Sequence, residues 1–323
     1  MTNQQTKMTF EVDLQREKNR QRVMKIVVQI LLYSFLVLMA FIIIFPFYFM
    51  IISSVKTLDE YKMPQQTMWP QHVEFFKDTL IPVNYIEAFN TARLGTLFKN
   101  TLYVGVVSTA LSLVITVITA FAFARLEFKG KNALFAALLA TMMIPGELFT
   151  ITNYQTVSDF MGLTTLGREL GMRGLRELGN WKDSYTVLIV PFLVSVFYIY
   201  LLRQNFLQIP NELYLAAKVD GTSDIKYLCK VMIPLAFPTL ISITILKMMG
   251  AWNSYMWPKL VTKDETYELI TNGLRNSFSD ATGDVNIPVQ MAAVAIVSAP
   301  LFLVFIFLRK YIMKGVSRSG IKG

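Results

Sequence analysis

The sequence predicts an all-α integral membrane protein with six transmembrane helices. Of its 323 residues 54% are apolar, and the mean hydropathy is +0.44, which is typical neither of a soluble globular domain nor of a disordered chain. Crossing a bilayer takes roughly 18 to 20 apolar helical residues. Charge-free windows of sufficient length are Ile26–Val55, Thr101–Ala124, Ser184–Leu202 and Val285–Leu308, and two further windows with one charge each are Ala133–Tyr154 and Val231–Trp257.

The distribution of charge orients these helices. Three loops carry a net charge of −3, whereas the termini and the two other loops carry +11. By the positive-inside rule the basic segments are cytoplasmic, namely 1–26, 123–132, 203–230 and 309–323. The acidic side comprises 56–97, 155–184 and 258–288. The net charge of +9 therefore sets orientation, and we expect no binding of nucleic acid.

The first helix follows the basic stretch "REKNRQRVMK", which resembles the start of a signal peptide. The apolar run after it is about twice as long as a signal-peptide core, and no small-residue cleavage site follows. We therefore expect a cytoplasmic segment 1–26 and a retained helix. The outer segment 56–97 has proline breaks and aromatic anchors, which predict a folded extracytoplasmic loop.

The third helix and the segment after it contain helix-breaking residues. Pro145 and Gly146 in "MMIPGELF" predict a kink or break. The outer segment 155–184 has five glycines between Gly162 and Gly179, which argue against one stable helix. Its part 166–183 either contacts a partner or is simply tolerated outside the membrane.

A polar helix–glycine–helix elbow interrupts the apolar runs in the cytoplasmic loop 203–233. "NELYLAAKV" can form about two helical turns capped by Asn211, with one face made of Leu213, Ala216 and Ala217. Gly221 suits the left-handed position that ends such a helix.

The second helix of the elbow can be capped by Thr222 or Ser223, and Asp224 favours its positive end. Its apolar stripe is expected to consist of Ile225, Leu228 and Val231. From the residues alone, the elbow is either a site for a partner or a surface loop without one.

Nothing in the chain is equipped for covalent chemistry or ATP hydrolysis. Cys229 and His72 are each the single residue of their type, and no Walker A, GxSxG or HExxH motif occurs. We predict a non-enzymatic chain that binds no metal.

The elbow resembles the "EAA" loop of ABC importer permeases: "LAAKVDG" is followed at the right spacing by "MIP". Further similar stretches are "NTLYVGVVSTALSLVITVITAFAFARLEFKGK", "MMIPGE", "IYLLRQNF", "AWNSYMWP" and "KGVSRSGIKG". Together they cover about residues 25–323. The chain is thus identified as similar to the second permease subunit of maltose-type carbohydrate importers, with the type I importer fold over residues 27–313 and a cytoplasmic tail 314–323.

The resemblance implies a bacterial inner-membrane assembly with a second permease, two ATP-binding subunits and an extracytoplasmic sugar-binding protein. ATP and magnesium would lie on the ATP-binding subunits, and this chain would bind no cofactor. The implied ATPase-coupling residues are Glu212, Leu215, Ala216, Ala217, Asp220 and Gly221. The family's motif glutamate falls at Leu215, which puts its usual salt bridge in doubt. The tail is implied to reach the ATPase dimer through Ser317, Gly320 and Lys322; a flexible inside-positive tail is the alternative.

Candidate pathway residues are the two charges inside spans and the aromatic motif. Glu147 and Lys247 lie roughly 20 Å from the cytoplasmic edge at 1.5 Å per residue, and such charges usually face a cavity or a partner. They can form an ion pair, or Glu147 can snorkel to the outer surface. Trp252, Asn253 and Tyr255 of "AWNSYMWP", together with Trp257, offer sugar-stacking faces or form an aromatic belt.

Three functions fit these features. The first is import of an oligosaccharide or related glycan. The second is ABC import of a polyol or of glycerol phosphate, disfavoured because no predicted span contains an arginine for the phosphate. The third is an ATP-independent secondary transporter, which predicts inverted repeats that the sequence lacks.

Overall fold

The computed structural model describes residues 2–65, 67–77, 79–278 and 286–317, of which 2–19 and 310–317 by their backbone only. All regular structure in this part of the chain is helical, apart from one isolated β-bridge between Phe75 and Pro82. The predicted all-α class is confirmed.

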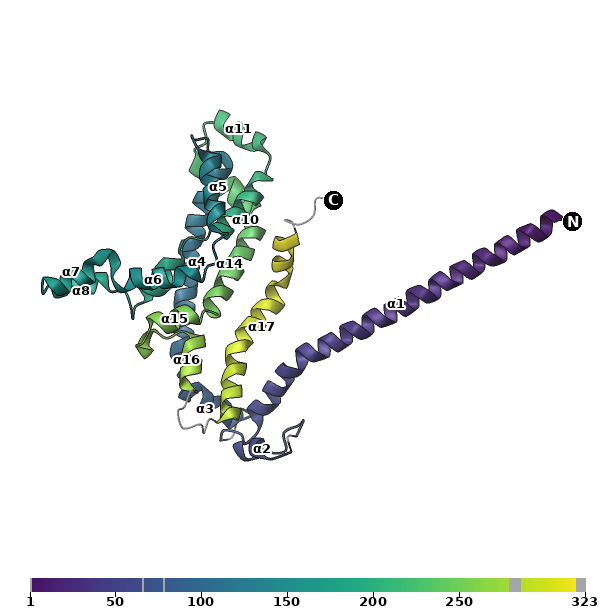
Figure 1. The fold of residues 1–323 in the computed structure, drawn as a ribbon, viewed down its shortest axis with the longest axis horizontal. Helices are drawn as coiled ribbons and strands as arrows, with labels where there is room; N and C mark the ends of the chain where they lie inside the picture. Colours follow the sequence, from purple (N-terminus) through teal and green to yellow (C-terminus); the bar gives the residue numbers. More distant parts are fainter. Residues whose placement is uncertain (1, 66, 78, 279–285, 318–323) are drawn as a thin grey trace.

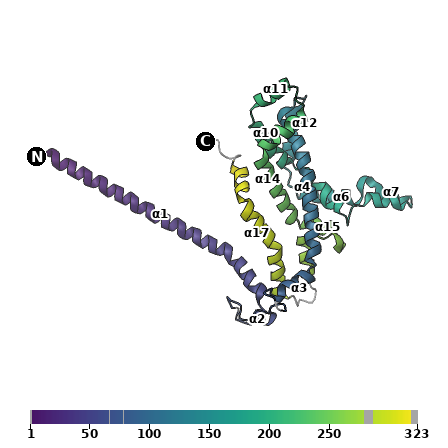
Figure 2. The ribbon, with the colours of Figure 1, turned by 180° about the vertical axis from the view of Figure 1, so that it is seen from behind.

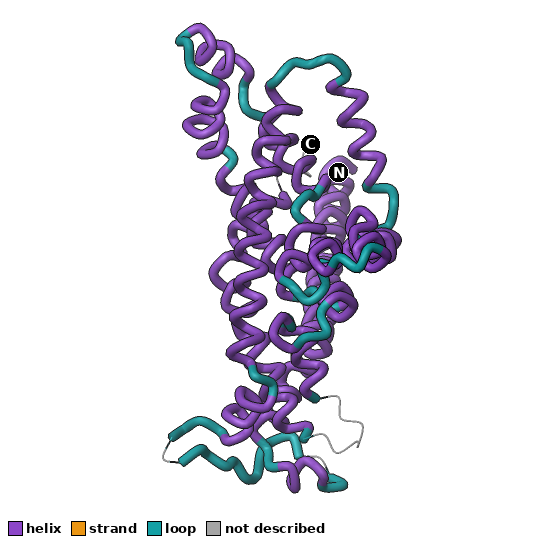
Figure 3. Tube along the Cα trace, turned by 90° about the vertical axis from the view of Figure 1, so that its left-hand side faces the viewer, coloured by secondary structure: helices purple, strands orange, loops and turns teal. Residues whose placement is uncertain are grey.

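Four helices form an elongated bundle (Figures 1 and 3): α4 (Leu94–Arg125), α10 (Val196–Leu207), α14 (Phe237–Trp252) and α17 (Ile287–Ser317). One end of the bundle carries α2 (Leu58–Lys62) and α3 (Val83–Thr91), and the other carries α11 (Asn211–Val219). The long α1 (Thr2–Val55) contacts α17 near α3 and then leaves the bundle at an angle (Figure 2). Most of its side chains from Val23 to Phe47 are exposed.

The exact count of six spans is not confirmed. In the described residues three helices are long and apolar enough to cross a membrane, and five spans result if two bent helix pairs each count as one. The third predicted window is divided into α5 (Lys131–Thr141) and α6 (Leu148–Ser158). Pro145 and Gly146 lie in the gap, as the expected break requires, and α6 runs sideways out of the bundle (Figure 1).

The fourth and fifth windows are bent rather than straight. α9 (Tyr185–Ile189) and the 3₁₀ turn η2 (Val190–Phe192) meet α10 at 46°. The elbow continues through α12 (Asp224–Tyr227), the π-helical turn η3 (Leu228–Met232) and α13 (Ile233–Leu235), and the last of these meets α14 at 79°.

The segment 155–184 forms an arm that projects from the bundle (Figure 1). After α6 come η1 (Phe160–Gly162), α7 (Leu163–Glu169) and α8 (Arg173–Gly179). The two short helices pack closely because Gly167 and Gly179 have no side chain: a Cβ on Gly167 would lie 2.6 Å from the Arg176 amide nitrogen, and one on Gly179 would lie 2.4 Å from that of Thr164. The expectation that these glycines prevent a single helix is confirmed.

Segment 56–97 is folded, as predicted, around a buried ion pair. Lys56 Nζ lies 3.8 Å from the Glu60 carboxylate, and both side chains are at most 2% exposed. The amide nitrogens of Gln71 and His72 donate to Glu60 at 3.0 and 3.2 Å. Further along come α15 (Met256–Val261), η4 (Glu265–Tyr267) and α16 (Ile270–Ser277); α15 contacts α6 and α9, and α16 packs on α4 between α15 and α3 (Figure 1).

Two predicted domain boundaries fall inside helices. α1 continues through residue 26 without interruption, and α17 continues through 313 to Ser317. The basic residues at both ends favour water, but the helical backbone satisfies its own hydrogen bonds and so continues beyond the apolar run.

Candidate coupling elbow and membrane pocket

The elbow begins at α11 and ends where α14 enters the bundle. Pro210 occupies the N-cap position and Asn211 is the first helical residue, so the predicted Asn211 cap is wrong by one position. Gly221 has φ +69°, the left-handed conformation expected of it. Ser223 caps α12 by accepting a hydrogen bond from the Lys226 amide at 3.4 Å. The elbow therefore has a defined angle.

Asp224 braces the two arms of the elbow against each other. Its Oδ1 accepts from the Tyr214 hydroxyl at 2.8 Å and pairs with Lys218 Nζ at 2.7 Å. The hydrogen bond from Lys218 and that from Tyr214 hold the pKa of Asp224 below its ordinary value. Burial and then the Asp224 hydrogen bond raise the pKa of Tyr214. All three groups therefore keep their paired forms at neutral pH.

The faces of α11 differ from the predicted pattern. Tyr214 and Ala217 pack inward on the core beneath the elbow, whereas Leu213 and Ala216 are exposed. Outward apolar side chains also include Leu215, 55% exposed, and Val219, 88% exposed. An apolar surface at the end of the bundle is thus available to a partner, and the exposed acids Glu212 and Asp220 flank it in the sequence.

The second arm is anchored by part of the predicted stripe. Leu228 is buried in the core and Val231 packs against it, whereas Ile225 is 75% exposed. Tyr227 and Met232, which the predicted stripe did not include, are also buried in this core. The core does not extend to Ile225, which adds instead to the exposed apolar surface.

Two arginines fix the base of the elbow to α4, a feature that sequence reasoning missed. Arg125 Nη2 donates to the carbonyl oxygens of Phe206 at 3.0 Å and of Ile209 at 2.5 Å, at the end of α10. In return Arg203 Nε donates to the Phe123 carbonyl at 3.1 Å. The last carbonyl oxygens of a helix lack partners within the helix. An arginine near the end of α4 and another near the end of α10 were therefore the signal in the sequence for these bonds. Movement of the elbow is thereby coupled to two bundle helices.

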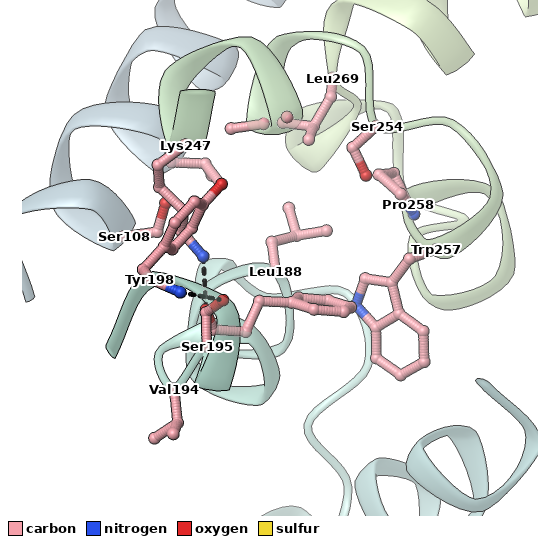
Figure 4. A pocket seen from close by; sticks show the side chains of 14 residues that line it. Ser108, Leu188, Val194, Ser195, Tyr198, Lys247, Ser254, Trp257, Pro258 and Leu269 are labelled. Atoms are coloured by element: carbon pink, nitrogen blue, oxygen red, sulfur yellow. Dashed lines mark hydrogen bonds between the residues drawn. The ribbon is translucent and has the colours of Figure 1, made fainter. Parts of the chain in front are cut away.

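A second feature is a cavity of about 420 Å³ in the bundle (Figure 4). It lies where α9 and α10 bend, between α4, α14 and α15. Lys247 lines it, half-buried, and donates from Nζ to the Phe192 carbonyl at 2.5 Å. Its lining residues include Ser108, Ser195, Tyr198, Ser254 and Trp257.

The expected ion pair between Glu147 and Lys247 does not form. Glu147 is exposed at the start of α6, and no ion pair joins these two described residues. The break at Pro145 turns the chain sideways and carries Glu147 away from the bundle axis. Lys247 alone is therefore the cationic residue of the cavity.

The aromatic motif serves packing more than an open surface. Trp252 is 6% exposed, in a core cluster beside Phe98. Trp257 is equally buried and donates to the Val187 carbonyl at 2.9 Å. Asn253 is exposed and donates to the Met249 carbonyl at 3.0 Å. Tyr255 is half-buried, with Lys259 and Arg275 over its ring. Trp252 is enclosed in the core, whereas Trp257, although mostly buried, lines a cavity of the bundle.

The tail residues cannot be assigned contacts. Ser317 is the last residue of α17 and only its backbone is described, whereas Gly320 and Lys322 lie outside the described residues. Among the described side chains, no group of three or more His, Cys, Asp or Glu could hold a metal ion.

A bundle of apolar helices, with a folded segment at one end and a braced elbow at the other, is typical of a polytopic membrane protein. The sequence pattern of the family "binding-protein-dependent transport system inner membrane component" matches residues 112–318, more than half of the chain. The chain belongs to this family. It is a non-catalytic permease of an ABC importer, which replaces the secondary-transporter alternative.

Relatives with assigned transport roles are similar along most of the chain. The arabinooligosaccharides transport system permease protein AraQ of Halalkalibacterium halodurans is 28% identical over 88% of this chain and 93% of its own length. The sn-glycerol-3-phosphate transport system permease protein UgpE of Agrobacterium fabrum is 26% identical over 90% and 96%. The polygalacturonan/rhamnogalacturonan transport system permease protein YtcP of Bacillus subtilis is 25% identical over 91% and 97%.

A solved structure shares the fold. A chain of a bacterial ABC transporter involved in the import of the acidic polysaccharide alginate superposes with a TM-score of 0.70. The superposition covers 88% of this chain and 96% of that chain at 20% identity. Bends and breaks in the helices are thus compatible with a permease fold.

Proposed function

We propose that this chain is one of two permeases in an ATP-driven importer for an oligosaccharide or a related glycan, together with two ATP-binding subunits and an extracytoplasmic sugar-binding protein. Support comes from the oligosaccharide and polysaccharide transport roles of relatives such as AraQ and YtcP. ATP and magnesium belong to the ATP-binding subunits. Both termini and the elbow are cytoplasmic in this proposal, because the segments on that side are basic.

The elbow is the contact with an ATP-binding subunit, and its geometry is the observation that carries the proposal. Closure of the ATP-binding subunits moves α11, and the brace at Asp224 passes that movement to α12 without bending. The clasp formed by Arg125 and Arg203 then carries it to α4 and α10. A rigid-body tilt of packed helices is a common route for such transitions.

Leu215 makes this contact apolar. The exposed side chains of Leu215, Val219 and Ile225 supply a surface that burial would stabilise. Ala216 permits close approach, while Glu212 and Asp220 remain as exposed acids at its edge. The tail residues Ser317, Gly320 and Lys322 provide a second contact with the ATPase dimer.

Glycerol phosphate is the second candidate substrate, because UgpE is similar over nearly the whole chain. Lys247 is the cation that such a substrate needs within the bundle. Among the other candidate pathway residues, Glu147 and Asn253 are exposed, Tyr255 is half-buried and Trp252 lies in the core.

Gly221→Pro tests the elbow, since proline fixes φ near −65° and cannot adopt +69°. Gly221→Asn is the matched control, because asparagine tolerates the left-handed conformation. We expect the assembled importer with Gly221→Pro to lose receptor-stimulated ATP hydrolysis, and Gly221→Asn to keep most of it. Unchanged hydrolysis with Gly221→Pro, or failure of any ATPase to copurify with the wild-type chain, would contradict the proposal.

A further inference from the structure

The cavity of Figure 4 has the size and the wall of a small-ligand site. Its volume of about 420 Å³ is within the range of roughly 300 to 1,000 Å³ that is common for such sites. Figure 4 places Lys247, Ser108 and Tyr198 on one side and Trp257, Pro258 and Ser254 on the other. One side is thus polar and the other largely apolar, a combination that suits a sugar ring with its hydroxyl edge and its apolar face.

Lys247 brings an uncompensated charge to this cavity. It lies within α14, where a charge is expensive unless it faces a cavity or a partner. Its one hydrogen bond in the described structure goes to the neutral carbonyl of Phe192. An ammonium group has three donors, and none of the residues that line the cavity is acidic. The cavity can therefore accommodate an anionic group next to Lys247, and none of its lining residues provides one.

Hydroxyl groups surround that charge. Ser108 donates to the Gly105 carbonyl at 3.3 Å, and Ser195 Oγ accepts from the Tyr198 amide at 3.5 Å. The Tyr198 hydroxyl, in contrast, has no hydrogen bond within the described part of the chain and lines the same wall. Hydroxyl groups that line one wall of a cavity can bind a polar ligand, because each can both donate and accept a hydrogen bond.

We propose that Lys247 binds the carboxylate of an acidic sugar, and hence that the importer transports uronate-containing oligosaccharides. This inference rests on the proposed function and specifies its substrate. The ammonium group pairs with the carboxylate, Tyr198 and Ser254 bond ring hydroxyls, and Trp257 with Pro258 forms the apolar wall.

The charge balance favours a carboxylate over a phosphate. A phosphate monoester carries about −1.5 to −2 charges at pH 7, whereas the cavity has a single cation and its other polar side chains are neutral. At this subsite the carboxylate of a single uronate unit neutralises the ammonium group, so Lys247 is paired and no excess charge is added next to it.

The experiment uses the whole importer, with its partner permease, ATP-binding subunits and receptor, in proteoliposomes. The three probes are trigalacturonate, which is acidic, neutral arabinotriose, and sn-glycerol 3-phosphate. The variants are Lys247→Met, which removes the charge, and Lys247→Arg, which keeps it. Lys263→Met is the matched control, because Lys263 is an exposed lysine that does not line the cavity.

We expect ATP-dependent uptake of trigalacturonate by the wild type. Lys247→Met should reduce this uptake at least tenfold, which corresponds to about 1.4 kcal/mol. Lys247→Arg should restore uptake to within about threefold of the wild type. Uptake by Lys263→Met should equal that of the wild type. If the wild type takes up arabinotriose or glycerol phosphate but not trigalacturonate, the inference about acidic sugars is wrong, whereas the assignment of the chain to an ATP-driven importer still holds.

Two further outcomes also overturn the inference. Equal loss of every transported probe in Lys247→Met assigns the lysine a structural role. Loss of the partner permease from purified Lys247→Met assigns the charge to a contact between subunits. Failure of ATP-dependent uptake of all three probes by the wild type contradicts the proposed glycan importer itself.

Discussion

The two ends of the bundle treat charged residues in opposite ways. At the end that carries α2 and α3, Lys56 and Glu60 are buried together and accept or donate several hydrogen bonds. At the elbow end Lys218 and Asp224 form a pair that is more than a third exposed, and the apolar residues Val219 and Ile225 face outward. The first end buries its charges, whereas the elbow end leaves both charges and apolar side chains exposed. We therefore expect substitutions at the Lys56–Glu60 end to change mainly the stability of the protein, and substitutions at the elbow to change mainly its coupling to ATP hydrolysis.

Glu60→Gln should give the largest effect and confine it to stability. Removing one member of a buried ion pair costs about 3 kcal/mol, because the amide cannot replace the carboxylate that accepts from Gln71 and His72. Thermal unfolding of the purified chain in detergent measures the loss. Glu87→Gln, at an exposed position in the same segment, should unfold like the wild type. An unchanged unfolding temperature in Glu60→Gln would mean that the ion pair does not hold this end together.

Acid should weaken the same end. Burial alone would raise the pKa of Glu60, but the hydrogen bonds from Gln71, His72 and Thr67 outweigh it and lower the pKa from 4.5. Since the folded carboxyl has the lower pKa, its stabilising contribution is complete above pH 4.5 and is lost as the pH falls through the folded value. Unfolding temperatures measured from pH 7 to pH 3 should fall in that window, and less steeply in Glu60→Gln. Parallel curves would contradict the assignment.

Asp224→Asn should show the converse pattern at the elbow. The pair with Lys218 is exposed, so its loss should change stability by no more than about 1 kcal/mol. Receptor-stimulated ATP hydrolysis should fall about fivefold, the ratio that corresponds to about 1 kcal/mol, because the two arms of the elbow are no longer braced. Glu127→Gln, at an exposed position in the turn after α4 and outside the elbow, provides the control. Equal hydrolysis by both variants would show that the brace does not transmit movement.

Gly167→Ala should disturb the arm and spare both ends. The added Cβ would lie 2.6 Å from the Arg176 amide and 2.8 Å from the Met172 carbonyl, and such overpacking costs about 1–3 kcal/mol. Limited proteolysis should cut the arm faster while the unfolding temperature of the bundle stays nearly constant. Gly174→Ala meets no atom within 4 Å and should resist proteolysis at least as well as the wild type. If both variants are cut alike, the glycine contact is not what holds α7 against α8.

Glu147→Gln should have the smallest effect. Glu147 is exposed at the start of α6 and lies outside the lysine cavity, and surface substitutions usually change stability by less than about 0.5 kcal/mol. Uptake rates within twofold of the wild type are expected in proteoliposomes. A large loss of uptake would return Glu147 to the transport pathway.

Local signals made the elbow predictable, whereas long-range contacts remained hidden. Gly221, the Ser223 cap and the break near Pro145 each depend on a few neighbouring residues, and all were anticipated. The bond from Arg125 to Phe206 joins residues 81 positions apart, which no periodicity reveals. Periodicity placed Ile225 on the same face as Leu228 and Val231, but it could not show that the core does not extend to Ile225. The bends within the fourth and fifth windows were hidden for a related reason: apolar length does not show where a helix bends.

The arm formed by α7 and α8 offers a practical handle for imaging this protein. Gly171 joins α7 to α8 with φ +66° and nothing within 4 Å of where a Cβ would lie. A compact domain could be inserted there through two short helical extensions of α7 and α8. The contact at Gly167 already holds these two helices against each other. In electron microscopy such a graft would serve as an alignment marker for the particle, far from the elbow and without altering the helices that move.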